Sequence, residues 1–261
     1  MHHPSPDVVT AWLAALESRH LADLRVPEVT RALRALSSAY VERRHTVARG
    51  ATLDSRGKRA AFALFYAPLH LYVTRHIVES LGAGEPPPSS VLDLGCGTGT
   101  AGAAWALAAG GVPVSGIDRH PWAVDEARWT YARLGLSGHA RTGDVARWGQ
   151  SDGSDPALLR PGSAIVSAYV LNELPDDARA RVEDGLFAAA ERGIAILVIE
   201  PIARPLTPWW DGTVRRFAAI GGRADEWRFS PELPKLLKLF DKAAGLNHQA
   251  LTARSLYCRN H

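Results

Sequence analysis

The spacing of apolar residues predicts helices in the first third of the chain. Apolar side chains repeat at helical intervals in two early segments, first at Val8, Val9, Trp12, Leu13 and Leu16, then at Val29, Leu33, Leu36 and Tyr40. Pro6 precedes the first segment and Pro27 opens the second, as is typical of helix starts. A third stretch, Ala60 to Leu81, predicts a helix that Pro68 bends or breaks.

The pattern changes after Gly82 to Ser90, where glycines and three consecutive prolines predict a connector. Short apolar runs of strand length follow at Ser90 to Leu94, Val112 to Ile117, Ala140 to Thr142, Ala164 to Tyr169 and Ile194 to Ile199. Segments with helical character lie between them, at Gly102 to Ala109, Trp122 to Leu134 and Asp176 to Glu191. This alternation predicts a doubly wound α/β fold, with a mostly parallel sheet covered on both faces.

We therefore expect two regions, a helical one over 1–84 and an α/β one over 85–261. The segment after Glu200 is less regular. Trp227 to Phe229 and Ser255 to Arg259 are candidate edge strands, with a helix expected from Leu233 to Ala244 between them.

The composition argues against several classes of protein, among them disulfide-rich and membrane-spanning proteins. The 261 residues carry a formal net charge of only +3, which by itself does not indicate a polyanionic partner. The two cysteines, Cys96 and Cys258, are too few for a disulfide scaffold or an all-cysteine zinc site, and they favour a cytoplasmic location. No apolar run reaches the ~18 residues of a membrane span, and the N-terminus lacks the features of a secretory signal.

The segment Val91 to Thr100 is the most informative, because an apolar run leads into three alternate glycines, Gly95, Gly97 and Gly99. Glycine lets a backbone turn tightly and approach a ligand closely, and the helix that follows presents its N–H groups to that ligand. Asp118 follows Gly99 by 19 residues and ends the second expected strand, where a carboxylate accepts hydrogen bonds from both ribose hydroxyls. Asp144 follows the third strand. All these features fall at strand ends, where doubly wound sheets bind ligands.

This combination resembles the class I S-adenosylmethionine-dependent methyltransferases over about Ser90 to Pro201. The resemblance implies a seven-stranded, Rossmann-like sheet with an antiparallel strand at its C-terminal edge. It also implies that the glycine loop holds the methionine part of the cofactor, Asp118 the ribose and Asp144 the adenine amino group. The residues expected to bind S-adenosylmethionine, and its product S-adenosylhomocysteine, are Asp93, Gly95, Cys96, Gly97, Gly99, Asp118, Arg119, Asp144, Val145 and Tyr169.

A second likeness is to the mitochondrial small-ribosomal-subunit methyltransferase-like family. It rests on Ser167 to Pro175 after the fourth strand, on Val198 to Pro201 after the fifth, and on the helical region that ends with Tyr72 to Leu81. That family often carries a cysteine cluster after the fifth strand, which this chain lacks. We therefore expect no metal.

Candidate residues for the methyl acceptor lie beyond the fourth strand. Tyr169 and Asn172 are expected to orient an acceptor, and Glu173 or Glu200 to accept a proton. Further candidates for contact with the substrate are Tyr66, His70, Glu200, Trp209 and Trp210. Each has an alternative interpretation in which it is an ordinary core, capping or surface group, and the two tryptophans pack against the helical region.

Val41 to Arg59 is locally basic, with six basic residues against two acidic ones: Arg43, Arg44, Arg49, Arg56, Lys58 and Arg59 oppose Glu42 and Asp54. Such a stretch is a candidate phosphate-binding patch or a solvated helix face.

Three hypotheses about function remain open. The first is a methyltransferase for a nitrogen or oxygen atom, acting on RNA, a ribonucleoprotein or a small metabolite. The second is a protein of the same fold that binds the cofactor, or assists ribosome assembly, without turnover. The third is an NAD-dependent oxidoreductase, because Gly97, Gly99 and Gly102 also satisfy the dinucleotide fingerprint, although Asp93 and Asp144 argue against it. The oligomeric state is left open.

Overall fold

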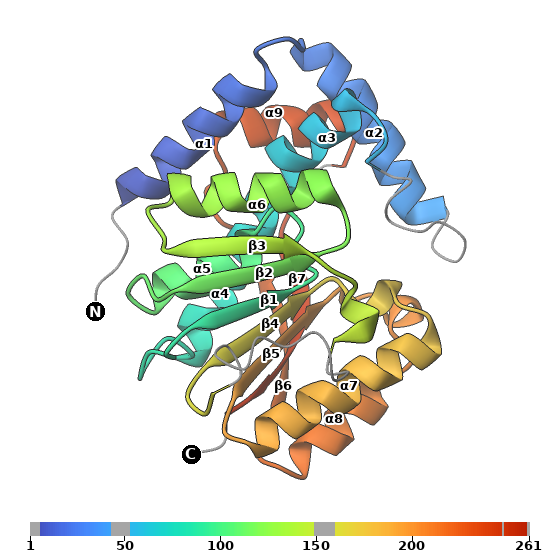
Figure 1. Ribbon diagram of the computed structural model, residues 1–261. Helices are drawn as coiled ribbons and strands as arrows, with labels where there is room; N and C mark the ends of the chain where they lie inside the picture. Colours follow the sequence, from blue (N-terminus) through green and yellow to red (C-terminus); the bar gives the residue numbers. More distant parts are fainter. Residues whose placement is uncertain (1–5, 43–52, 149–159, 247, 260–261) are drawn as a thin grey trace.

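The computed structural model describes residues 6–42, 53–148, 160–246 and 248–259. Within these ranges the chain forms a seven-stranded sheet in the order β3-β2-β1-β4-β5-β7-β6 (Figure 1). The strands are β1 (Val91–Leu94), β2 (Val114–Asp118), β3 (Gly138–Thr142), β4 (Ala164–Ala168), β5 (Ala195–Glu200), β6 (Arg223–Phe229) and β7 (Leu251–Cys258). The doubly wound, mostly parallel fold expected from the sequence is therefore confirmed.

The first five strands are parallel, and the sheet order reverses at β1, which pairs with β2 on one side and β4 on the other. The interior strands β1, β2 and β5 are buried along their whole length, which explains their continuous apolar runs. The C-terminal part differs from expectation. Because β7 inserts between β5 and β6 and is antiparallel to both, it is an interior strand, and of the two expected edge strands β6 alone lies at an edge of the sheet.

Helices cover both faces of the sheet. The α-helices are α1 (Pro6–His20), α2 (Val26–Glu42), α3 (Arg56–Ala61), α4 (Ala67–Leu81), α5 (Thr100–Ala108), α6 (Pro121–Arg133), α7 (Asp176–Glu191), α8 (Trp210–Ala218) and α9 (Lys235–Ala244). Shorter helical segments are η2 (Phe62–Tyr66), η3 (Val145–Arg147), η4 (Leu171–Glu173) and η5 (Arg204–Leu206). No helix in the described ranges has both the length and the apolar character needed to cross a bilayer.

Two hydrophobic cores lie on opposite faces of the sheet. On one face, Trp12, Leu33 and Phe65 of the N-terminal helices join the same cluster as Trp105 of α5 and Leu197 of β5. The two regions expected from the sequence therefore share one core, and in Figure 1 helices α1, α2 and α3 lie over α6. On the other face, α7 and α8 pack on the sheet through a second cluster, which includes Val182, Phe217 and Ile165.

The third helical stretch is continuous but irregular. The segment Phe62–Tyr66 is π-helical, and the backbone N–H of Ala67 donates to the carbonyl of Phe62, five residues earlier. Pro68 lies in the first turn of α4. Because proline has no N–H and its ring clashes with the carbonyl four residues before it, the irregularity falls ahead of Pro68 instead of at it.

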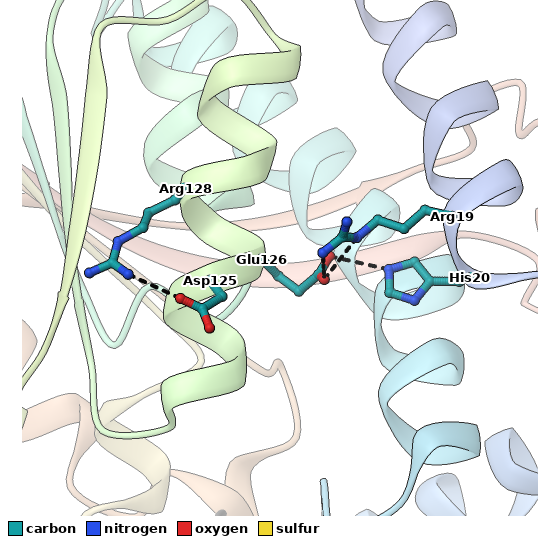
Figure 2. A network of polar contacts seen from close by, with 5 residues as sticks. All are labelled: Arg19, His20, Asp125, Glu126 and Arg128. Carbon is teal, nitrogen blue, oxygen red and sulfur yellow. Dashed lines mark hydrogen bonds and ion pairs between the residues drawn. The ribbon is translucent and has the colours of Figure 1, made fainter.

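A buried carboxylate ties α1 to α6. Glu126 is 2% exposed, and its Oε1 accepts hydrogen bonds from Nε and Nη2 of Arg19 at 3.0 and 2.8 Å. His20 Nε2 lies 3.2 Å from its Oε2. Figure 2 shows this cluster beside the exposed pair of Asp125 and Arg128. Burial raises the pKa of Glu126, but His20 and Arg19 together outweigh it, so the pKa lies below its usual value.

We predict that Glu126→Gln lowers the free energy of unfolding by about 1–3 kcal/mol, because hydrogen bonds to a charged, buried acceptor are lost. Because the folded-state pKa of Glu126 is depressed, this contribution is present above the unfolded pKa of ~4.3 and is lost as pH falls through the folded value. Urea unfolding at several pH values measures it. The matched control is Asp125→Asn, whose exposed ion pair with Arg128 contributes about 0–1 kcal/mol. Equal effects of the two substitutions would contradict the assignment.

Candidate functional site

A cavity opens at the carboxyl ends of the parallel strands, at the point where the sheet order reverses. Its volume is about 1020 Å³, counting the part open to solvent. Residues that follow β1, β2, β3 and β4 form most of the wall, and the N-terminal region supplies the rest: Leu53, Phe62, His70, Asp93, Gly95, Cys96, Gly97, Thr98, Thr100, Ala101, Asp118, Arg119, His120, Ala123, Asp144, Val145, Ala168, Val170, Glu173 and Leu174.

The loop between β1 and α5 has room only for glycine at two positions. Gly95 has φ +70°, and a Cβ there would lie 2.5 Å from the side chain of Val170. Gly99 has φ +81°, and a Cβ there would lie 2.8 Å from the ring of Tyr131. Gly97, with φ +52°, differs, because the nearest atom to its Cβ position is the ring of Phe62 at 3.9 Å. The loop is therefore packed tightly on its inner side and open toward the cavity.

Asp118 lies at the end of β2, and two backbone N–H groups orient its carboxylate. Oδ2 accepts from Gly97 N at 2.9 Å, and Oδ1 accepts from His120 N at 2.8 Å. The side chain thus bridges the glycine loop and the start of α6, and a carboxylate oxygen has further lone pairs to offer to a ligand.

Asp93, in β1, and Cys96, within the loop, are both buried. Asp93 Oδ2 accepts from Gly102 N at 2.7 Å. Burial raises the pKa of Asp93 to about 7, with the charge of Asp118 adding to the increase and the Gly102 N–H opposing it. Burial likewise raises the pKa of the Cys96 thiol, so this side chain is a neutral wall of the cavity and not a reactive thiolate.

The expected adenine side of the site lies after β2 and β3. Asp144 is exposed, and its Oδ1 accepts from Ala146 N at 3.0 Å at the start of η3. Val145 is buried and lines the cavity, and Arg119 is exposed at its margin.

The lining fits S-adenosylmethionine, the cofactor that the sequence resemblance implies. Two buried polar atoms of the lining, Thr98 Oγ1 and His120 Nδ1, have no hydrogen-bond partner within the described protein. Hydroxyl and amino groups of a nucleoside and an amino acid can pair with such atoms. The carboxylates of Asp93, Asp118 and Asp144 also suit a ligand that carries hydroxyls and positive charge.

The residues after β4 meet the N-terminal region here. Tyr169 has φ +58°, in the left-handed region, and its N–H donates to Ile199 O at 2.8 Å. Its ring stacks on His70 of α4 with 4.5 Å between the ring centroids. Burial and the charge of Glu200 raise the pKa of Tyr169, so its phenol stays protonated. His70 and Glu173 line the cavity.

Tyr169, Asn172 and Tyr66 lie beside the cavity, outside its lining. The Oδ1 of Asn172 is buried with no hydrogen-bond partner among the described residues. Tyr66 lies next to His70, with 6.4 Å between their ring centroids.

Glu200, expected to contact substrate, is fully buried instead. Its Oε1 accepts from the backbone N–H groups of Leu171 at 2.9 Å and Asn172 at 3.4 Å. A carboxylate at the end of β5 thus fixes the turn η4, and this structural role replaces the expected contact with substrate.

Trp209 and Trp210 also differ from expectation. They do not line the cavity, and they pack with the core on the α7 and α8 side of the sheet, away from the N-terminal helices. The guanidinium of Arg179 lies 5.1 Å from the ring centroid of Trp209, and that of Arg254 lies 5.3 Å from Trp210. The β6–β7 pair brings Arg254 there, which the local sequence does not reveal.

Sequence reasoning missed several lining residues, above all Phe62. The available signal was the spacing of Phe62, Tyr66 and His70, four residues apart, which puts their rings on neighbouring positions of one helical face. All three are partly exposed, whereas the residues between them are buried.

The described part of the basic stretch is largely neutralised. Arg56 pairs with Asp23 at 2.6 Å, Lys58 with Asp54 at 3.1 Å, and Arg59 Nε donates to Leu53 O at 2.8 Å. Arg43, Arg44 and Arg49 lie outside the described residues.

Comparison with known proteins gives a family match. Residues 91–187 match the profile of the family described as the methyltransferase domain. The ribosomal RNA small subunit methyltransferase C of Chromohalobacter salexigens is 38% identical over 88 residues, which is 33% of this chain and 25% of that protein. This chain thus spans about a quarter of the length of that relative.

Solved structures show a similar fold. The plantazolicin methyltransferase BpumL, in complex with a triazolic desmethylPZN analog and S-adenosylhomocysteine, has a TM-score of 0.53 and 11% identity, over 90% of this chain and 98% of that one. A putative O-methyltransferase from Nostoc punctiforme has a TM-score of 0.50 and 14% identity, over 92% of this chain and 71% of that one. Together, the match over residues 91–187 and the order of the sheet show that this chain is similar to methyltransferase domains and shares their Rossmann-like fold.

Proposed function

We propose that this chain transfers a methyl group from S-adenosylmethionine to a nitrogen or oxygen atom of a small-molecule acceptor. The observation that carries the proposal is the position of Asp118. Its carboxylate is fixed by Gly97 and His120 in a cavity that continues to His70 and Glu173. The same cavity therefore contains a site for a nucleoside and, next to it, room for a methyl acceptor.

In this proposal the cofactor spans the ends of the first three strands. Asp118 accepts the ribose hydroxyls, Asp144 and Val145 hold the adenine, and Arg119 borders it. The methionine part lies along Asp93, Gly95, Cys96, Gly97 and Gly99. When bound, S-adenosylmethionine supplies a methyl group on a positively charged sulfur, which is already an activated leaving group. The protein's task is to align donor and acceptor, about 3–3.5 Å apart, and to exclude water.

The loop after β4 and the N-terminal region provide the acceptor side. Tyr169, as a neutral phenol stacked on His70, and Asn172 orient the acceptor. Glu173, whose carboxylate lines the cavity, takes the proton that the acceptor nitrogen or oxygen loses as its bond to carbon forms and the carbon–sulfur bond breaks. Glu200 holds the turn that carries Asn172 and Glu173. Residues 1–84 then serve as the substrate and lid region.

Electrostatics favour a small acceptor over RNA. Asp118, Asp144 and Glu173 line the cavity together with Asp93, which is partly protonated near neutral pH because its pKa is raised to about 7, and Arg119 is the single Lys or Arg of the lining among the described residues. Such an excess of acid repels phosphate groups. The pairing of Arg56 and Lys58 with carboxylates points the same way. A cytoplasmic location is part of the proposal, supported by two cysteines that form no disulfide.

We predict that Gly97→Arg abolishes binding of S-adenosylhomocysteine, because the side chain enters the open side of the loop and fills the cavity. Isothermal titration calorimetry measures the binding. Gly110→Arg is the matched control, since Gly110 also has a positive φ, of +83°, but lies at the end of α5 with no atom within 4 Å of its Cβ position. Unchanged affinity in the Gly97 variant would refute the cofactor assignment.

We predict that Asp118→Ala weakens S-adenosylhomocysteine binding by about 10- to 100-fold, the effect of losing hydrogen bonds to a charged acceptor. Asp125→Ala removes an exposed carboxylate from the following helix and is expected to leave the affinity unchanged. A normal dissociation constant for the Asp118 variant would argue against the ribose contact.

For the acceptor, we predict that labelled methyl groups pass from S-adenosylmethionine to a small-molecule fraction of a cell extract and not to its RNA. Transfer to RNA, with binding that weakens steeply as salt rises, would instead support the RNA hypothesis. Tight cofactor binding with no transfer to either fraction would favour a binding protein without turnover.

A further inference from the structure

The N-terminal region contributes an aromatic arc to the cavity that no strand-end motif accounts for. Phe62 and His70 line the cavity, and their rings lie 6.2 Å apart, edge to face. His70 in turn stacks on Tyr169 at 4.5 Å. Three rings therefore run in series from the glycine loop to the loop after β4, across the opening between β1 and β4.

The ring of Phe62 borders the glycine loop. Its Cζ and Cε1 atoms lie 3.9 and 4.0 Å from the Cβ position of Gly97. The N–H of the same Gly97 donates to Asp118 Oδ2 at 2.9 Å. Phe62 therefore borders the glycine loop, along which the proposed function places the methionine part of S-adenosylmethionine with its sulfonium.

The surroundings of Phe62 favour a cation. The lining holds four carboxylate side chains, on Asp93, Asp118, Asp144 and Glu173, against one arginine, Arg119. An aromatic face attracts a positive charge most strongly where that charge is shielded from water, and Phe62 is partly buried. A thioether carries no charge, so neither the ring nor the acids attract it in this way.

A backbone irregularity accompanies this ring. The π-helical segment begins at Phe62, where the hydrogen bond spans five residues instead of four. Phe62, within this distortion, and His70, after it, lie on the same wall of the cavity, and π-helical turns are frequent at functional sites.

We propose that Phe62 makes the cavity selective for the charged donor over the neutral product. The π system of its ring attracts the positively charged sulfonium of S-adenosylmethionine. The neutral thioether of S-adenosylhomocysteine lacks this attraction. Loss of charge on methyl transfer then weakens this contact and favours release of the product. The inference rests on the proposed function, and it adds a specificity-determining residue from outside the matched segment 91–187.

The test compares dissociation constants for three ligands by calorimetry at pH 8, where histidine is largely neutral. The ligands are S-adenosylmethionine, S-adenosylhomocysteine and an analogue with an ammonium in place of the sulfonium. We expect Phe62→Leu, which keeps an apolar side chain but removes the π system, to weaken both cationic ligands about three- to tenfold. Its effect on S-adenosylhomocysteine is expected to stay below about twofold. Phe62→Tyr, which keeps the ring, is expected to retain the selectivity of the wild type.

The matched control is Phe187→Leu. Phe187 is also a partly buried phenylalanine, and it holds a cation, the guanidinium of Arg216 at 4.4 Å, but it lies on α7 on the other face of the sheet. This variant is expected to change none of the three constants, and thermal unfolding of all variants verifies that they fold.

If Phe62→Leu weakened the binding of all three ligands equally, the ring would act only as an apolar surface, and the inference would be overturned. The same holds if the substitution had no effect on the binding of any of them. With either result, binding of the ligands to the wild-type chain still supports the proposed function. If the wild-type chain binds none of the ligands, the proposed function and this inference both fail.

Discussion

The site depends on the carboxylate of Asp118 and the two backbone N–H groups that hold it. Gly97 donates from the loop after β1, and His120 donates from the loop after β2. One side chain thereby fixes the relative position of two neighbouring strand ends. Because the carboxylate is oriented before any ligand arrives, little conformational entropy remains to be lost on binding. The glycines of the loop make this arrangement possible, because their positive φ values disfavour other residues.

Buried carboxylates elsewhere in the structure also join two segments by accepting hydrogen bonds. Asp93 accepts the N–H of Gly102 and so joins β1 to α5, and Glu200 accepts the N–H groups of Leu171 and Asn172 and so fixes η4. Glu126 joins α6 to α1 through Arg19 and His20. A buried carboxylate is stable only when such donors surround it, so each of these contacts also specifies how two segments meet.

The N-terminal helices are part of the same structure as the sheet. Trp12 and Phe65 share a core with Trp105 and Leu197, so the N-terminal wall of the cavity packs directly on the sheet domain. Phe62 and His70 are therefore presented from a packed helical wall. Among the described residues, the lining of the cavity includes these two rings, four acidic residues and one arginine, Arg119.

The sequence by itself determined the alternation of strands and helices from β1 to β5 and the position of the glycine loop and Asp118 at strand ends. Apolar periodicity and the spacing of Gly95, Gly97, Gly99 and Asp118 are local features, and successive parallel strands bring their ends together by topology alone. The insertion of β7 between β5 and β6, and the position of Trp210 on the far face, came only from the tertiary structure. The same holds for the burial of Glu200 and the approach of Phe62 to Gly97. These are contacts between segments far apart in the chain, and no local pattern encodes which faces meet, because that is decided by how the helices and the sheet pack into shared cores.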